Sequence, residues 1–243
     1  MLSIFKKEIN TFFSSLIGYI VIAVFLVYLS LMIWVFPDTS IFEYSYATLD
    51  QLFDLSPTIF LFLIPAITMR SFAEEMQTGT IELLVTRPLS DMQIILGKFF
   101  ACVTLVLFAL LPTLIYYFTI YSLGSPVGNI DGGATWGSYI GLLLLGASFV
   151  AIGIFSSSIT KNQIVSFVLA TFLCFVFYWM FDMLSRIPVF VGKIDDVIQG
   201  FGIQAHYTSI SRGVVDSRDV IYFLSLIAFF VMATKVSLES RKW

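Results

Sequence analysis

Long apolar runs separated by short polar segments dominate this chain. An α-helix needs about 20 predominantly apolar residues to cross the hydrocarbon core of a bilayer. The apolar runs meet this length, and Trp residues lie near several of their ends, as is typical of membrane interfaces. The sequence therefore predicts six transmembrane helices, at about residues 16–36, 52–69, 92–121, 136–157, 163–183 and 220–237.

The N-terminal segment, residues 1–15, has a different pattern. Its apolar residues recur at spacings of three and four, which places them on one face of a helix and leaves Lys6, Lys7 and Glu8 on the other. We expect a short helix that lies in the membrane interface. The apolar run that follows is too long for the hydrophobic region of a cleaved signal peptide, so we interpret it as an uncleaved first span.

Composition supports an all-α polytopic membrane protein. Of the 243 residues, 58% are hydrophobic and only 12% are charged, and the mean hydropathy is +0.95. Soluble domains typically carry about 25% charged residues, so a soluble or disordered chain is excluded. The length favours a single transmembrane domain over residues 1–243. The net charge of −3 gives no indication of a nucleic-acid partner.

Basic residues predict the orientation. If the N-terminus is cytoplasmic, the first two outer loops contain no Lys or Arg, and the outer basic residues all lie in one loop, residues 184–218. The positive-inside rule therefore predicts that both termini are cytoplasmic. The inner set is Lys6, Lys7, Arg70, Arg87, Lys98, Lys161, Lys235, Arg241 and Lys242, and the outer set is Arg186, Lys193, Arg212 and Arg218.

The inner segment of residues 70–90 contains several helix signals. Ser71 and Glu74 have the spacing of a capping box, which predicts a short helix that Gly79 can end. Thr78 or Thr80 can start a second short amphipathic helix over residues 81–86, which Pro88 stops.

A further capping box, Ser90 to Gln93, predicts the start of the third span. That span is longer than one bilayer crossing. We therefore expect its first turns, with Lys98, to project into the lipid headgroups.

No catalytic motif is present. The chain lacks a phosphate-binding GxxxxGK[ST] loop, so we expect it not to hydrolyse ATP, and it also lacks HExxH, CxxC and GxSxG motifs. Cys102 and Cys174 lie in apolar runs and are interpreted as packing residues. The single His206 is interpreted as a loop residue or a hydrogen-bonding group within the chain, and not as a ligand. We expect no metal and no cofactor in this chain. Charges inside the spans are scarce, which favours a protein that draws its energy from a partner.

The segments 70–75, 79–84, Pro88 and Gly97-Lys98 resemble the ABC-2 type transporter permeases, and residues 156–163 and 201–223 resemble the second cytoplasmic loop and the last outer loop of that family. The resemblance covers nearly the whole chain. It is strongest to the gliding-motility-associated ABC transporter permease subunit, with the nitrous-oxide-reductase maturation permease as a near relative.

The resemblance implies a type V exporter-like permease in the bacterial inner membrane. It implies two permease copies, two ATPase subunits that bind ATP and Mg²⁺, and an auxiliary membrane protein with an extracytoplasmic domain. It also implies that segment 70–90 carries a coupling helix that contacts the ATPase, through Glu74, Glu75, Thr78, Gly79, Thr80, Ile81, Glu82, Leu83 and Leu84.

Simpler interpretations stay open for these residues. Glu74 and Glu75 can be solvated loop charges, and the apolar face of residues 81–86 can rest on membrane lipid. The small-residue pairs Gly137–Gly141 and Ala147–Ala151 fit packing within the chain as well as a dimer seam.

Two other functions fit the composition. One is a secondary transporter that needs no ATPase, which would require a path of ionisable groups through the spans. The other is a non-transporting membrane scaffold of a surface machine.

Overall fold

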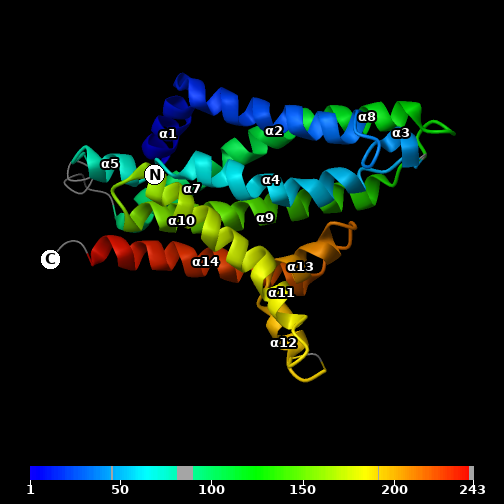
Figure 1. Cartoon of the computed structure of the whole chain (residues 1–243). Coiled ribbons are helices and arrows are strands. Elements are labelled where there is room, and N and C mark those ends of the chain that lie inside the picture. Colours follow the sequence, from blue (N-terminus) through cyan, green and yellow to red (C-terminus); the bar gives the residue numbers. More distant parts are fainter. Residues whose placement is uncertain (45, 81–89, 191, 241–243) are drawn as a thin grey trace.

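The computed structural model describes residues 1–44, 46–80, 90–190 and 192–240, and within these ranges it contains helices and no β-strand (Figure 1). Five helical segments are long and apolar enough to cross a membrane, and the bent pair at the N-terminus is a sixth candidate. The all-α polytopic fold expected from the sequence is confirmed.

The helices begin and end within a few residues of the predicted spans. The spanning segments are α2 (Leu16–Trp34), α4 (Asp50–Thr68), α7 (Asp91–Leu110) continued by η1 (Leu111–Thr113) and α8 (Leu114–Leu123), α9 (Gly132–Ile159), α10 (Gln163–Phe175) continued by the π-helical turn η2 (Val176–Met180) and α11 (Phe181–Ser185), and α14 (Ser217–Glu239).

The first helix, α1 (Leu2–Ser14), makes an angle of 70° with α2. In Figure 1 it lies across one end of the bundle and not along it. It packs against α7, which is the third spanning segment. The N-terminus and the last turn of α14 lie at this end of the bundle (Figure 1).

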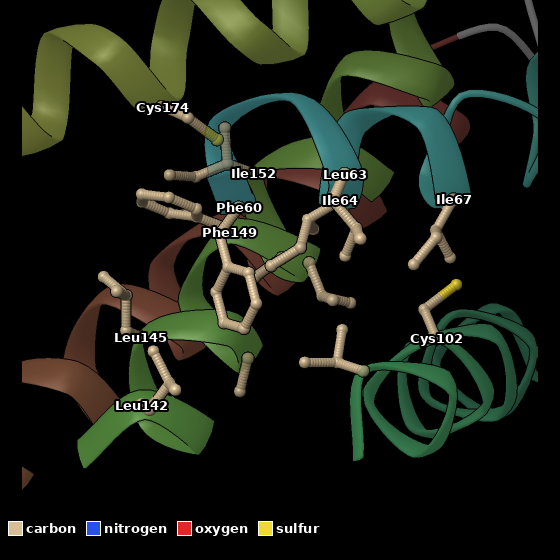
Figure 2. Packing of buried hydrophobic residues seen from close by; sticks show 14 of the residues in the cluster. Phe60, Leu63, Ile64, Ile67, Cys102, Leu142, Leu145, Phe149, Ile152 and Cys174 are labelled. Carbon is tan, nitrogen blue, oxygen red and sulfur yellow. The ribbon is translucent and has the colours of Figure 1, made fainter. Parts of the chain in front are cut away.

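Helix α9 is the centre of the packing, because it contacts α4, α7, α10, α13 and α14. Figure 2 shows its side chains Phe149 and Ile152 meeting Phe60 and Ile64 of α4. The spans differ in how much of their most apolar stretch is buried inside the protein. This share is 78% for α9, but only 22% for the α10–α11 span and 22% for α14. The last two helices therefore leave most of their surface to lipid or to partners.

The remaining short helices are α3 (Ile41–Tyr44), α5 (Ala73–Gln77), α12 (Asp195–Gly200) and α13 (Ile203–Ile210). In Figure 1, α11 and α12 project sideways from the bundle, whereas α13 packs on α9. His206 on α13 has the hydrogen-bonding role that the sequence suggested. Its Nδ1 lies 2.7 Å from Asp219 Oδ1 of α14, and its ring stacks on Tyr222 at 3.9 Å between centroids.

The predicted small-residue pairs on α9 are packed within this chain. A Cβ atom on Gly137 would lie 2.6 Å from Gly213 O, and one on Gly141 would lie 2.9 Å from Ile210 Cβ. These two glycines therefore let the α13 segment approach the backbone of α9 closely. Ala147 and Ala151 are buried one to three turns further along the helix.

We predict that Gly141→Ala lowers the free energy of unfolding by about 1–3 kcal/mol, because the added methyl overlaps the branched side chain of Ile210. Thermal unfolding in detergent measures the effect. Gly133→Ala on the same helix is the matched control, since its Cβ would meet nothing closer than 3.4 Å. Equal unfolding midpoints for the two variants would contradict the close approach.

Candidate functional site

Helix α5 is a short helix at the end of the bundle where α1 and the last turn of α14 lie (Figure 1). It follows α4 after a four-residue link, residues 69–72. It ends at Thr78, and Gly79 follows with φ +72°, a left-handed conformation that glycine adopts without a Cβ penalty. The predicted helix end at Gly79 is therefore confirmed.

The predicted capping box of Ser71 and Glu74 is wrong. The N-cap position is Phe72, and no side chain of the segment itself caps the helix. Instead, Ser157 Oγ of α9 accepts hydrogen bonds from the backbone N–H groups of Phe72 and Ala73, at 2.9 and 3.0 Å, and donates one to Met69 O at 3.1 Å. A single fully buried hydroxyl thus joins the end of α9 to the start of α5.

The hydroxyl of Ser71, which would have to cap the helix, turns toward α7 instead, and so does its backbone carbonyl. Its hydroxyl lies 3.7 Å from Cys102 Sγ, and its backbone carbonyl accepts a hydrogen bond from Lys98 Nζ at 2.5 Å. The spacing of Ser71 and Glu74 is compatible with a capping box, but the contacts of Ser71 with α7 determine where its side chain lies.

Lys98 is buried, which corrects the expectation that it projects into the headgroups. Its side chain is 1% exposed, and its Nζ lies 2.7 Å from Glu8 Oε1 of α1 and 2.9 Å from Glu75 Oε1 of α5. The ring of Phe72 lies 4.9 Å from the same nitrogen. Since α1 crosses the end of the bundle, it brings a carboxylate to a lysine that would otherwise face the headgroups.

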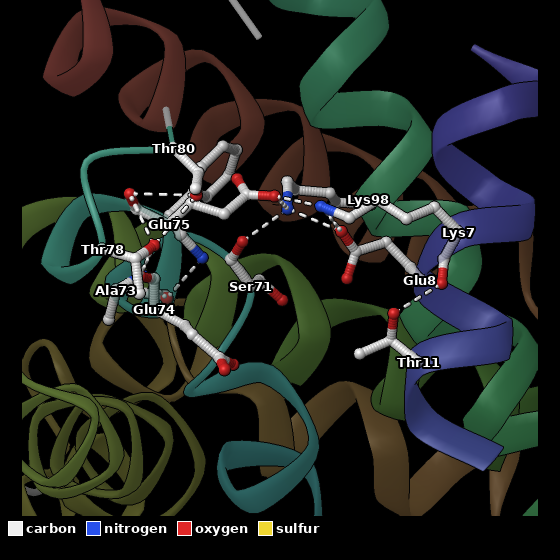
Figure 3. A network of polar contacts seen from close by, with 12 residues as sticks. Lys7, Glu8, Thr11, Ser71, Ala73, Glu74, Glu75, Thr78, Thr80 and Lys98 are labelled. Atoms are coloured by element: carbon white, nitrogen blue, oxygen red, sulfur yellow. Dashed lines mark hydrogen bonds and ion pairs between the residues drawn. The ribbon is translucent and has the colours of Figure 1, made fainter. Parts of the chain in front are cut away.

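Lys7 completes an ionic cluster, defined here as Lys7, Glu8, Glu75 and Lys98 (Figure 3). Lys7 Nζ lies 2.6 Å from Glu75 Oε1 and 3.7 Å from Glu8 Oε1. Burial lowers the pKa of Lys7, but the hydrogen bond and negative charge of Glu75, with the charge of Glu8, outweigh burial and raise that pKa. The ionic cluster therefore contains two cations and two anions, contributed by α1, α5 and α7, and has no net charge.

The two acidic residues of α5 have different surroundings. Glu75 is 7% exposed and belongs to the ionic cluster, whereas Glu74 is exposed. Ala73 and Met76 share the buried side, and Gln77 and Thr78 are exposed with Glu74. Helix α5 is thus fixed on one side and open on the other.

The described part of the predicted coupling segment also includes Thr80, whose hydroxyl lies 2.9 Å from that of Thr78. Ile81, Glu82, Leu83 and Leu84 lie outside the described residues, as does the rest of the expected second short helix. Within the described ranges no group of three or more His, Cys, Asp or Glu side chains could hold a metal ion.

Sequence reasoning missed Lys7, Glu8, Lys98 and Ser157 as site residues. One signal was present: a lysine within the apolar run 92–121 needs a partner, because an unpaired charge in a low-dielectric region is costly. The partner itself could not be identified, since Glu8 is separated from Lys98 by 90 positions.

Comparison with known proteins gives one match. The model of the family described as ABC-2 family transporter protein matches residues 2–239. No curated protein matches the chain.

We predict that Lys98→Met lowers the free energy of unfolding by up to about 3–5 kcal/mol, because it removes the buried cation that Glu75 and the half-buried Glu8 share and leaves them only the more exposed Lys7. Chemical or thermal unfolding of the detergent-solubilised chain measures the loss. Adding Glu75→Gln to Lys98→Met should recover part of it.

Lys235→Met is the matched control, because it also removes a lysine from a lysine–glutamate pair. Lys235 and Glu239 are 39% and 49% exposed and 3.7 Å apart, so the expected loss is at most about 1 kcal/mol. If the two methionine variants unfold alike, the ionic cluster does not stabilise the junction.

Proposed function

Since this chain belongs to the ABC-2 family of transporter proteins, we propose that it is a permease subunit whose helices are moved by a separate ATPase subunit. Members of such permease families are membrane components and not themselves ATPases. We assign binding of ATP and Mg²⁺, and the hydrolysis itself, to the partner. The role of this chain is then mechanical: it converts the motion of the partner into movement of the spans.

The observation that supports the proposal most is that α5 is bound to the bundle on one side and exposed on the other. Its inner side is tied to α1 and α7 by the ionic cluster and to α9 by Ser157, and its outer side exposes Glu74, Gln77 and Thr78 at the end of the bundle. A docking element needs both properties, because a partner must reach it and its displacement must move the rest of the protein.

The ionic cluster favours movement of α1, α5 and α7 together as one rigid body. Pulling α5 alone away from α1 and α7 would separate the buried Glu75 from both of its cations, Lys7 and Lys98, which costs several kcal/mol. Displacing α5 together with α1 and α7 breaks none of these contacts. Motion of α5 is therefore passed to α7, which continues through η1 and α8 toward the opposite end of the bundle.

We propose that the α5 end of the bundle is cytoplasmic. The described basic residues near this end include Lys6, Lys7, Arg70 and Lys161, and the N-terminus and the end of α14 lie on this side (Figure 1). An ATPase would then reach α5 and the short α9–α10 connection, residues 160–162, from the same compartment. This orientation follows the positive-inside rule.

The finer assignment is also a proposal. We keep the gliding-motility-associated permeases as the subgroup, on the resemblance of segment 70–98, and the bacterial inner membrane as the location. Two permease copies and an auxiliary membrane protein with an extracytoplasmic domain complete the proposed complex. The exposed surfaces of α10 and α14 leave room for such neighbours.

A polar path through the spans would favour a secondary transporter instead. One cavity beside α5 is lined by Lys7, Arg70 and Glu75, and a second, lined by Asp50 and Asp54, lies at the start of α4. No described residue lines both cavities, and within the described ranges the buried side chains of the spans are mainly hydrophobic. This arrangement supports an external source of energy.

We predict that an ATPase subunit co-purifies with the full-length permease in mild detergent, and that Gly79→Pro abolishes most of the stimulation of ATP hydrolysis by the permease. Proline fixes φ near −65° and cannot adopt the +72° of Gly79, so the segment beyond α5 must be redirected. The ATPase rate of the reconstituted complex is the measurement, and Glu82→Lys is expected to act in the same direction.

Gly192→Pro is the matched control. Gly192 has φ +74° and, like Gly79, no atom within 4 Å of a built Cβ, but it lies in the loop between α11 and α12. Its replacement should leave ATPase stimulation unchanged. Full stimulation in the Gly79→Pro variant, or the absence of any ATPase in the purified complex, would contradict the proposed function.

A further inference from the structure

A cavity of about 650 Å³ lies beside the ionic cluster, between α1, α4, α5 and α7. Its volume is within the 300–1,000 Å³ that is usual for sites of small ligands. Its lining includes apolar side chains, among them Phe12, Ile67 and Leu105, together with charged side chains. Gly18, just after the bend between α1 and α2, also lines it, so the cavity lies in the angle of that bend.

Two buried side-chain atoms that lack a hydrogen-bond partner belong to residues that line this cavity. They are Arg70 Nε, which is a donor, and Glu75 Oε2, which is an acceptor. Arg70 uses one guanidinium nitrogen, Nη1, on Ser15 Oγ at 3.4 Å, and Glu75 uses its other oxygen on the two lysines. Neither atom is itself exposed to the cavity, so a ligand there reaches them only when the two side chains turn toward it. Leaving a buried charged group partly unsatisfied is costly, which favours such a turn toward a ligand that accepts at one end and donates at the other.

The charges around the cavity select the kind of ligand. Two cations, Lys7 and Arg70, and three anions, Glu8, Glu74 and Glu75, line the cavity. Lys98 does not line it, but it pairs with Glu8 and Glu75 and brings the local charge to balance. A site with both signs and no net charge disfavours a ligand with a net charge and suits one that carries both signs. The apolar side chains of the lining further require that part of the ligand be hydrocarbon.

We propose that this cavity binds a zwitterionic phospholipid of the phosphatidylethanolamine type. The phosphate accepts from Arg70 Nε, the ammonium donates to Glu75 Oε2, and the acyl chains follow Phe12, Ile67 and Leu105 toward the bilayer. The bend between α1 and α2 is the point where an interfacial helix meets a span, and lipid headgroups occur at that depth. The bound lipid would fill the space under α1 and stabilise the junction.

The proposal is tested on the full-length chain without any ATPase, so its outcome is separate from that of the proposed function. Native mass spectrometry and thermal unfolding in detergent compare three probes: phosphatidylethanolamine, phosphatidylglycerol with the same acyl chains, and free phosphoethanolamine. We expect phosphatidylethanolamine to bind about tenfold more tightly than phosphatidylglycerol, since a hydrogen bond to a charged group contributes this much. Free phosphoethanolamine should bind far more weakly than the lipid.

Three variants separate the contributions. Arg70→Gln should weaken binding of both lipids about tenfold, because both carry the phosphate, whereas Glu75→Gln should abolish the preference for ethanolamine over glycerol. Because Glu75→Gln also removes part of the ionic cluster, Ala66→Leu provides a test without a change of charge: Ala66 lines the cavity, and the larger side chain should displace the lipid. Arg218→Gln, at the exposed start of α14, is the matched arginine control and should bind both lipids as the wild type does.

Equal affinity for the two lipids in the wild type would overturn the proposal, and so would unchanged binding in the Ala66→Leu variant. Phosphoethanolamine binding as tightly as the lipid would show a headgroup site for a soluble compound and would also overturn it. If Arg218→Gln weakens binding as much as Arg70→Gln, the lipid contacts the protein surface at large and not this cavity.

Discussion

The need to pair a buried lysine organises the cytoplasmic end of this protein as we propose it. Lys98 lies in an apolar helix, and with 1% of its side chain exposed it requires carboxylate partners nearby. The chain supplies them from two places far away in sequence, Glu8 of α1 and Glu75 of α5. Meeting this requirement places α1 across the end of the bundle and holds the short α5 helix against α7. The ionic cluster thus determines how the most exposed short helix at this end is attached.

The sequence predicted those features that depend on near neighbours or on helix length. The spans agree with the helices to within a few residues, the Ser90–Gln93 capping box is present, and Gly79 follows the end of α5 in the left-handed conformation. Each of these features is determined within one or two helical turns. The orientation, the dimer and the contact with an ATPase are expectations of another kind, since they concern the membrane and other chains.

The errors have a common physical cause. Ser71 was expected to cap α5, but the cap is Ser157, which is 85 positions from Phe72. Lys98 was expected among the headgroups, but its partners come from residue 8 and residue 75. In both cases a tertiary contact decided a polar group that local spacing had placed elsewhere, and a single sequence carries no record of such contacts.

In this account α1, α5 and α7 move as one body when the partner binds ATP. The most direct test is the distance between spin labels on Lys6 of α1 and Gln77 of α5, two exposed positions, in a chain with the buried Cys102 and Cys174 replaced by alanine. Double electron–electron resonance should give one narrow distance distribution that is the same in the nucleotide-free and the ATP-bound complex. A shift of the distribution between the two states would show that α5 moves independently of α1 and would contradict the account.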